Sequence, residues 1–192
     1  IGKQLMMKNS KVKDSNDSLL NAMKPSILRL CKRIHEDPHN VLSTGSVKLL
    51  QKITKNIILR VAKNAKAFAN DEKELSDLHI MKASRYIFDS KLFKNLYAEM
   101  TEFVGDHVNG INTKDLELTV SITAVANLLQ HYSKMKTSLY AEIALTALVE
   151  RILDDIISNA GSFEEQKTIL PKDIKNGIDS NNILSSLSIF YK

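Results

Sequence analysis

The residues that most resemble a catalytic site in this sequence are two histidines with a glutamate between them. His35, Glu36 and His39 match H-E-x-x-H, in which two histidines one helical turn apart bind zinc and the glutamate acts as a general base. That mechanism needs an unbroken helix through both histidines. Pro38 removes a backbone hydrogen bond and moves its predecessor away from helical angles. No third ligand stands nearby, so we favour a loop over a metal site.

The chain has a single cysteine, Cys31, one helical turn before His35. The two side chains could form a thiolate pair, but a lone cysteine on the apolar face of a short helix more often packs in a core. A single cysteine excludes an internal disulfide and fits a reducing compartment. The sequence has no glycine-rich phosphate loop and no nucleophile elbow. We therefore expect a protein that is not an enzyme and has no cofactor.

Positive charge is concentrated in the first part of the chain. The net charge is +5, from 27 Lys and Arg against 22 Asp and Glu. Residues 119–192 contain 7 Lys and Arg against 8 Asp and Glu, which leaves 20 against 14 for residues 1–118. This local excess favours a polyanionic partner without requiring one.

The composition predicts an all-α protein. Only 6 Gly and 3 Pro interrupt 192 residues, of which 43% are hydrophobic and 26% charged, as in ordinary globular proteins. No apolar run reaches the roughly 18 residues that span a bilayer. The first residue is Ile rather than Met, so we expect a trimmed chain.

A long helix over residues 43–69 dominates the first half of the chain. Ser43 and Thr44 are good N-caps, because their hydroxyls accept unpaired backbone N–H groups. Apolar residues then recur at steps of mostly three and four, which places them on one helical face. They are Val47, Leu50, Ile57, Ile58, Val61, Ala65 and Phe68. We expect partner helices along the whole of this face.

The same pattern of a short helix, a loop and a long helix occurs twice, about ninety residues apart. The first copy and its following helix are predicted at 25–37, 43–69, 76–88 and 91–108. The second copy is predicted at 121–132 and 139–160, with a segment from Pro171 and a terminal helix at 181–190. Neither copy is large enough to bury its long helix well alone. We expect the two long helices to pack together, with residues 1–23 as a tail or arm and 109–118 as a linker.

At this level the sequence resembles a fused pair of core histones. The run ILRLCKRIHEDPHNVLSTGSVKLLQKITKNIILRVAKNAKAFA resembles the two-B type, and LYAEMTEFVGDHV resembles the extra helix that follows it. VANLLQHY, LVERILDDIISNAG, TILPKDI and IDSNNILSSL resemble the two-A type. A two-B-like unit (24–108) before a two-A-like unit (119–192) is similar to the histone doublets of giant DNA viruses. The resemblance implies two tandem histone folds in an intramolecular handshake, with crossed antiparallel long helices and paired loops.

The resemblance implies that DNA is held by its phosphates, with little reading of the bases. In the two-B-like unit the candidate contacts are Lys24, Arg29, Lys32, Arg33, Ser43, Thr44, Lys48 and Lys73. In the two-A-like unit they are Lys134, Lys136, Lys167, Thr168 and Lys172. Lys136 and Thr168 stand at positions where the family touches phosphate. For each residue taken singly, a solvated surface role is an equal alternative.

The sequence departs from the family in three places. The loop around Lys73 reads EKELS rather than basic and hydroxyl residues, and SITAVANLLQ lacks the family's arginines. In the family's acidic patch, Glu99, Glu150 and Asp155 are retained. Other patch positions hold Lys91, Ser158, Ser180, Asn181 and Asn182. These changes predict a weaker grip on DNA by the two-A-like unit and favour a solvated acidic face over a partner site.

The function implied by the resemblance is DNA packaging in a nucleosome-like particle. Its partners would be double-stranded DNA and a second histone pair, or doublet, of the three and four types, with no membrane. Its location would be chromatin in the nucleus, or a viral factory and virion. The alternative is a histone-fold interaction module of a transcription or chromatin-regulatory complex. Arg60 and Arg151, within the two long helices, are expected to have structural roles.

Overall fold

Helices form most of this protein. The computed structural model describes residues 18–35, 41–161 and 168–191. The first half contains α2 (Lys24–Ile34), β1 (Val41–Leu42), α3 (Thr44–Ala69), β2 (Glu74–Leu75), α4 (Asp77–Ile87) and α5 (Ser90–Val108). The second contains α6 (Ile122–Ser133), β3 (Lys136–Thr137), α7 (Leu139–Gly161), β4 (Thr168–Ile169), α8 (Pro171–Ser180) and the 3₁₀ helix η1 (Ser185–Phe190). The predicted helical class is confirmed, and the order helix, strand, long helix, strand, helix occurs twice.

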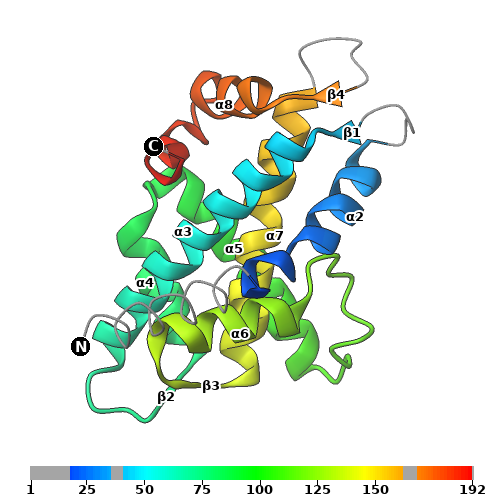
Figure 1. The fold of residues 1–192 in the computed structure, drawn as a ribbon. Coiled ribbons are helices and arrows are strands. Elements are labelled where there is room, and N and C mark those ends of the chain that lie inside the picture. The colour runs from blue at the N-terminus through cyan, green and yellow to red at the C-terminus, as the bar shows by residue number, and fades with distance from the viewer. Residues whose placement is uncertain (1–17, 36–40, 162–167, 192) are drawn as a thin grey trace, which may run out of the picture.

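The two long helices differ in how they are buried. Ser43 caps α3, because its side chain accepts a hydrogen bond of 3.1 Å from the backbone N–H of Ser46. α3 buries one apolar side and leaves a polar side in solvent. α7 is buried around most of its circumference, from Ala141 to Ala160. It therefore lies at the centre of the molecule, and α3 lies nearer the surface (Figure 1).

Helices from each half pack on the long helix of the other. α6 of the second half packs against α3, whereas α2, α4 and α5 of the first half pack against α7. One continuous hydrophobic cluster joins side chains such as Ile57 and Ile58 of α3 with Leu148 and Ile152 of α7. The expected packing of the two copies around a shared core is therefore confirmed.

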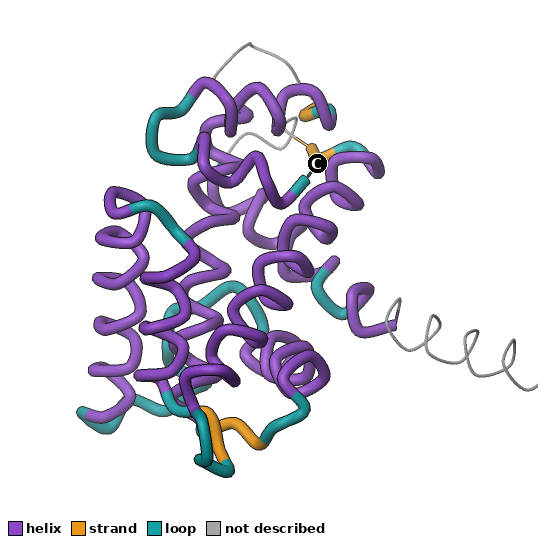
Figure 2. The backbone as a smooth tube through the Cα atoms, turned by 90° about the vertical axis from the view of Figure 1, so that its left-hand side faces the viewer, coloured by secondary structure: helices purple, strands orange, loops and turns teal. Residues whose placement is uncertain are grey.

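Two short parallel strand pairs tie the halves together at opposite ends of the molecule (Figure 1 and Figure 2). β1 pairs with β4, with Val41 opposite Thr168. β2 pairs with β3, with Glu74 opposite Lys136. Each pair thus joins a loop before one long helix to a loop after the other.

Two expectations about chain segments need correction. The expected arm at 1–23 does not extend to residue 23, because Met23 is fully buried and the amide of Gln51 donates a hydrogen bond to the carbonyl oxygen of Leu20. The terminal helix predicted at 181–190 is wrong in its first half. There the Asn181 side chain accepts from the backbone N–H of Ile183, forming a turn before η1.

The first histidine of the zinc signature, His35, does not lie on a helix. α2 ends at Ile34, and His35 has extended backbone angles, so the helix needed for the zinc signature does not run through it. Glu36 and His39 lie outside the described residues. Cys31 is buried, and burial raises the pKa of its thiol. The thiolate is disfavoured, and the packing role expected for Cys31 is confirmed.

Candidate nucleic-acid interface

The strand pair β1–β4 brings candidates from both halves to one end of the molecule. The backbone N–H of Ser43 donates to the carbonyl oxygen of Ile169 at 3.1 Å, and the Ser46 hydroxyl donates to the same oxygen at 2.6 Å. These bonds hold the N-terminus of α3 beside the strand that contains Thr168. An added Cβ on Gly45 would lie 3.0 Å from the Pro171 ring, so the N-termini of α3 and α8 also meet here.

The side chains at this end differ in their freedom to bind a ligand. The Ser43 hydroxyl is engaged as a cap and lies 2.8 Å from that of Ser46. Thr44, Lys48, Thr168 and Lys172 are exposed. Two helix N-termini with exposed hydroxyl and ammonium groups form an arrangement suited to phosphate. Lys167 lies outside the described residues.

The N-termini of α2 and α6 form the second group. Ser121, the cap of α6, donates its backbone N–H to the Ser26 hydroxyl of α2 at 3.1 Å. Arg29 donates to the same hydroxyl at 3.3 Å and to the Thr119 carbonyl oxygen at 3.2 Å. Lys24 is exposed at the first position of α2. Arg29 therefore helps to join the two helices and is not wholly available to a ligand.

Arg33 has a different partner from the one that the sequence predicts. Its guanidinium donates to Glu150 at 2.6 Å, to Asp154 at 2.7 Å and to the Thr119 hydroxyl at 2.7 Å. Burial disfavours its charged form, but the hydrogen bonds to the two carboxylates outweigh this and raise the pKa of Arg33. The expected phosphate contact by Arg33 is corrected to an internal ion pair, because two carboxylates already neutralise it.

The same contact changes the role expected for Glu150. Only 5% of this residue is exposed, and its second carboxylate oxygen accepts the backbone N–H of Val120 at 2.7 Å. Glu150 therefore holds α7, α2 and the segment before α6 together. Its expected place on an open acidic surface is wrong, because its carboxylate is buried and fully engaged.

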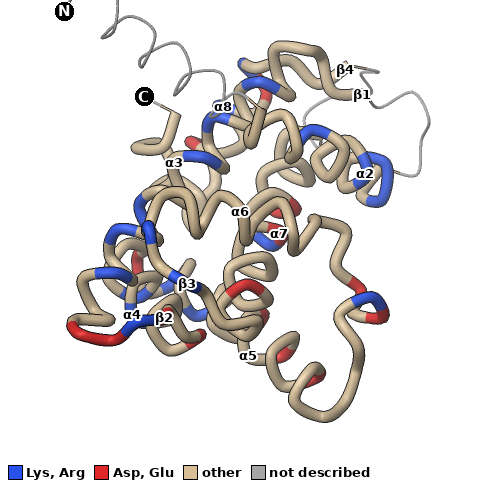
Figure 3. The backbone as a smooth tube through the Cα atoms, turned by 60° about the horizontal axis from the view of Figure 1, so that its bottom comes forward, with Lys and Arg blue, Asp and Glu red and all other residues tan. Residues whose placement is uncertain are grey.

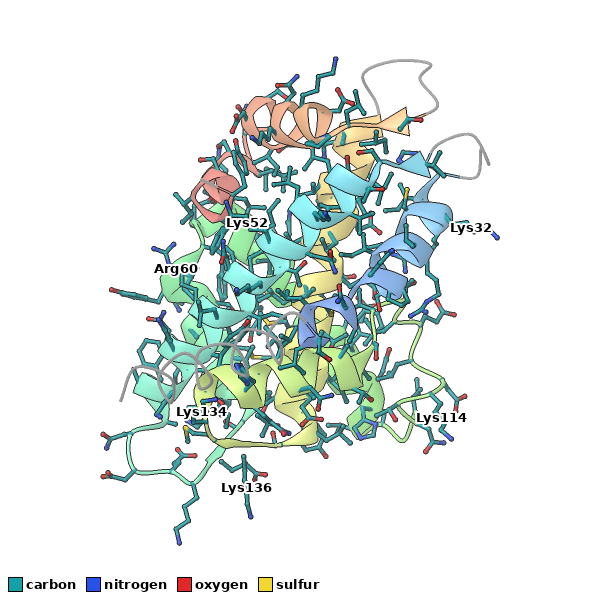
Figure 4. All side chains as sticks on the ribbon, viewed as in Figure 1. Lys32, Lys52, Arg60, Lys114, Lys134 and Lys136 are labelled. Atoms are coloured by element: carbon teal, nitrogen blue, oxygen red, sulfur yellow. The ribbon has the colours of Figure 1, made fainter. Side chains whose placement is uncertain are left out.

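The strand pair β2–β3 forms the third group. Lys73, Lys134 and Lys136 are exposed around it, and Lys134 and Lys136 project at this end in Figure 4. Lys134 ends α6 in the left-handed region with φ of 58°. The Ser138 backbone N–H donates to the Leu75 carbonyl oxygen at 2.9 Å. Figure 3 shows basic residues around β3 and acidic residues in the loop before β2, as the EKELS departure predicts.

The remaining acidic candidates surround an arginine. Arg151 of α7 lies 3.1 Å from Asp155 and 3.7 Å from Glu99 of α5. Burial raises the pKa of Glu99 and that of Asp155, although Arg151 opposes both shifts. Arg151 thus pairs two helices, in line with its expected structural role. One guanidinium shared between two carboxylates neutralises only part of their charge, so the cluster offers a basic partner less charge than two free carboxylates would.

Sequence reasoning missed the residues that join the halves around Arg33. Thr119, Val120 and Asp154 contact Arg33 or Glu150, but they lie 86 to 121 residues from Arg33. A single sequence contains no signal at that separation. The one local signal is the pair of serines, Ser26 and Ser121, near equivalent helix starts in the two copies.

In comparisons with known proteins, no protein-family model matches this chain, and no curated protein matches it significantly. Among the helices of the described residues, none is both long and apolar enough to cross a membrane. The basis for a proposed function is therefore the geometry of the three groups of candidate residues.

Proposed function

We propose that this protein is a doublet of two tandem histone folds that binds DNA by its phosphates and packages it in a nucleosome-like particle. The observation that carries the proposal is the reciprocal strand pairing of the two copies. β1 precedes α3 and pairs with β4, which follows α7; β2 follows α3 and pairs with β3, which precedes α7. A handshake of two histone folds needs this exchange of loops.

Three places on the molecule support phosphate binding. They are the β1–β4 end with Thr44, Lys48, Thr168 and Lys172, the α2–α6 start with Lys24, and the β2–β3 end with Lys73, Lys134 and Lys136. At the first two, helix N-termini from both copies meet. Backbone N–H groups and ammonium groups grip phosphates without reading base sequence. The proposed interaction is therefore independent of sequence.

An exposed aromatic pair supports the need for a second histone pair. Phe68 at the end of α3 and Tyr86 of α4 contact each other edge to face at 6.3 Å between ring centroids. They are 41% and 75% exposed. Two large aromatic rings on adjoining helix surfaces are typical anchors of protein interfaces. We propose that a pair or doublet of the three and four types binds here.

The second candidate is a histone-fold interaction module of a transcription or chromatin complex. The internal pairing of Arg33 favours it, because that pairing removes one of the cations that would hold DNA. So does the overall charge, with 20 basic against 14 acidic residues in the first 118 and 7 basic against 8 acidic residues after them. An interaction module would use the Phe68–Tyr86 surface without wrapping DNA.

The salt dependence of DNA affinity tests phosphate binding. The logarithm of the association constant of a phosphate clamp falls linearly with the logarithm of salt concentration, by about 0.9 per phosphate contact. Changing Lys134 and Lys136 to Gln should reduce the slope by up to about 2. Lys82→Gln/Lys94→Gln, which alters exposed lysines on α4 and α5, is the matched control. A flat salt response in the unaltered protein contradicts the proposal.

A further inference from the structure

The outward side of α3 carries a row of basic residues that the candidate sites leave mostly unused. Lys48, Lys52, Lys55, Lys63 and Lys66 recur at steps of three, four and eight residues, which places them on one side of a helix. All but Lys55 are exposed, and Lys55 is half-buried. α3 also contains Arg60 and has no Asp or Glu. We call these five lysines the α3 lysine row.

The row is about 27 Å long, because Lys66 follows Lys48 by 18 residues, at a rise of about 1.5 Å each. In Figure 4, Lys52 of the row and the neighbouring Arg60 are on the side of α3 toward η1, whereas Lys32 projects from the far side of α2. Lys134 and Lys136 lie beyond the end of α3 in the same view. Lys48 also belongs to the β1–β4 end, and the rest of the row is a separate surface.

Two hollows follow each other along this surface. The first, of about 380 Å³, is lined by Lys48, Lys52 and Lys55 together with Leu20, Asn21 and Gln51. The second, of about 290 Å³, is lined by Asn56, Leu59, Arg60, Lys63, Ile189 and Phe190. Three ammonium groups around one hollow repel each other unless an anion lies between them. The arrangement favours a ligand with repeated negative charge.

The C-terminal segment fixes the part of the surface between the hollows. Lys52 donates to the carbonyl oxygen of Tyr191 at 2.9 Å, and Asn56 donates to that of Phe190 at 2.7 Å. The Arg60 guanidinium lies over the Phe190 ring, 5.5 Å from its centroid. Lys55, Lys63 and Lys66 make no hydrogen bond or ion pair within the part of the chain that the structure describes. Their charges are available to a ligand.

The composition of the row favours nucleic acid over a folded protein. Protein interfaces are depleted in lysine and need buried apolar anchors. The first hollow offers only Leu20 and aliphatic stems. Of the apolar residues in the second hollow, Phe190 is buried and Ile189 is exposed. Lysine ammonium groups bind phosphates as point charges and make no demand on base sequence. A straight row of lysines without acidic neighbours is suited to the backbone of a duplex.

We propose that the α3 lysine row binds a second DNA duplex, separate from the one held at the strand pairs. This inference takes DNA as the ligand from the proposed function, but it does not require that the protein wraps DNA. One chain would then link two DNA segments, such as neighbouring turns or neighbouring particles. The residues that carry the second contact are Lys55, Lys63 and Lys66, with Lys48 and Lys52 lining the first hollow.

The test is the number of short DNA duplexes bound per chain at low salt, measured as the mass of the complex by analytical ultracentrifugation. We expect two duplexes for the unaltered protein and one for Lys55→Gln/Lys63→Gln/Lys66→Gln. Gln has a helix propensity close to that of Lys, so α3 should remain folded, which circular dichroism checks. The matched control, Lys82→Gln/Lys94→Gln/Lys114→Gln, removes the same charge elsewhere and should still bind two.

The salt slope for the second duplex should also fall by up to about 3 in the α3 variant, at about 0.9 for each lost contact. Binding of one duplex by the unaltered protein, or of two by the α3 variant, overturns the proposal. If the α3 variant loses affinity for a polyglutamate peptide but still binds two duplexes, the proposal is overturned and an acidic protein is the favoured partner of the row. If the protein binds two duplexes but gives no footprint of wrapped DNA, the result supports DNA binding by the α3 lysine row and contradicts the packaging function.

Discussion

The guanidinium of Arg33 in α2 lies 2.6 Å from the carboxylate of Glu150 in α7, across 117 residues of sequence. Glu150 is buried, and it also receives the backbone N–H of Val120. A buried carboxylate is costly unless it is paired and hydrogen-bonded. Arg33 of the first copy therefore stabilises the buried carboxylate of Glu150 in the second copy.

Removing Arg33 should destabilise the fold. Arg33→Ala leaves the Glu150 carboxylate with one hydrogen bond, and we expect a loss of about 1–3 kcal/mol in the free energy of unfolding, because Arg33 is itself partly exposed. Urea denaturation measures it. Lys32→Ala, an exposed neighbour on the same helix, should change the value by less than about 0.5 kcal/mol. Equal effects of the two substitutions would refute the structural role.

In DNA binding the two substitutions should rank in the opposite order, with the larger effect from Lys32→Ala. Arg33 is neutralised by two carboxylates, whereas Lys32 projects into solvent (Figure 4). Lys32→Ala should reduce the salt slope of DNA affinity by about 1, and Arg33→Ala should leave it nearly unchanged. Fluorescence anisotropy with labelled duplex at several salt concentrations measures both. A larger slope change for Arg33→Ala would show that its ion pair opens to bind phosphate.

Two glycines inside helices should respond oppositely to alanine. A Cβ on Gly177 of α8 would lie 3.0 Å from the backbone nitrogen of Ala160 in α7, whereas one on Gly105 of α5 would meet nothing within 4 Å. Gly177→Ala should cost about 1–3 kcal/mol through overpacking, partly offset by helix propensity. Gly105→Ala should stabilise by about 0.5–1 kcal/mol. Thermal unfolding compares them, and a stabilising Gly177→Ala would exclude the close approach of α8 to α7.

The acidic cluster should make stability depend on pH. Burial raises the pKa of Asp155, so the folded state holds this proton to higher pH than the unfolded chain does. Ionisation of Asp155 therefore lowers the free energy of unfolding. The loss is absent below the pKa of Asp155 in the unfolded chain and appears as the pH rises through its pKa in the folded state. Asp155→Asn cannot ionise.

The unfolding free energy of Asp155→Asn should accordingly rise relative to that of the unaltered protein as pH increases through this window. Urea titrations at a series of pH values from acid to neutral measure the difference. Asp115→Asn, which removes an exposed carboxylate, is the matched control. A constant difference for Asp155→Asn would mean that Arg151 offsets the effect of burial, and a difference that falls with pH would mean that Arg151 outweighs it.

Local signals predicted the helices well. Residues 43–69 and 139–160 were expected as the long helices, and α3 and α7 cover Thr44–Ala69 and Leu139–Gly161, because caps and apolar periodicity act within a few residues. The end of the chain was predicted less well. Asn181 uses its side chain to cap a turn, a competition between side chain and backbone that periodicity does not report.

Contacts between the copies could not be predicted residue by residue. The two-residue strands are too short to show alternation, so the pairing of Val41 with Thr168 left no pattern. The candidate cations were found from charge and resemblance, and most described ones are exposed. Arg33 and Glu150 were misassigned because each looks like a surface residue by type, and only the packing of α2 on α7 makes them partners.

The cleavage pattern of DNA mixed with this protein and a partner histone pair tests the proposed packaging function most directly. The measurement is hydroxyl-radical footprinting of DNA reconstituted with this protein and a partner histone pair of the three and four types. Wrapping exposes the minor groove once per turn, so we expect protection over a long stretch with a period of about 10 base pairs. Lys134→Gln/Lys136→Gln should weaken protection at one end of each bound segment. Uniform cleavage with the unaltered protein, under conditions where it binds both DNA and the partner, would contradict packaging and favour the interaction module.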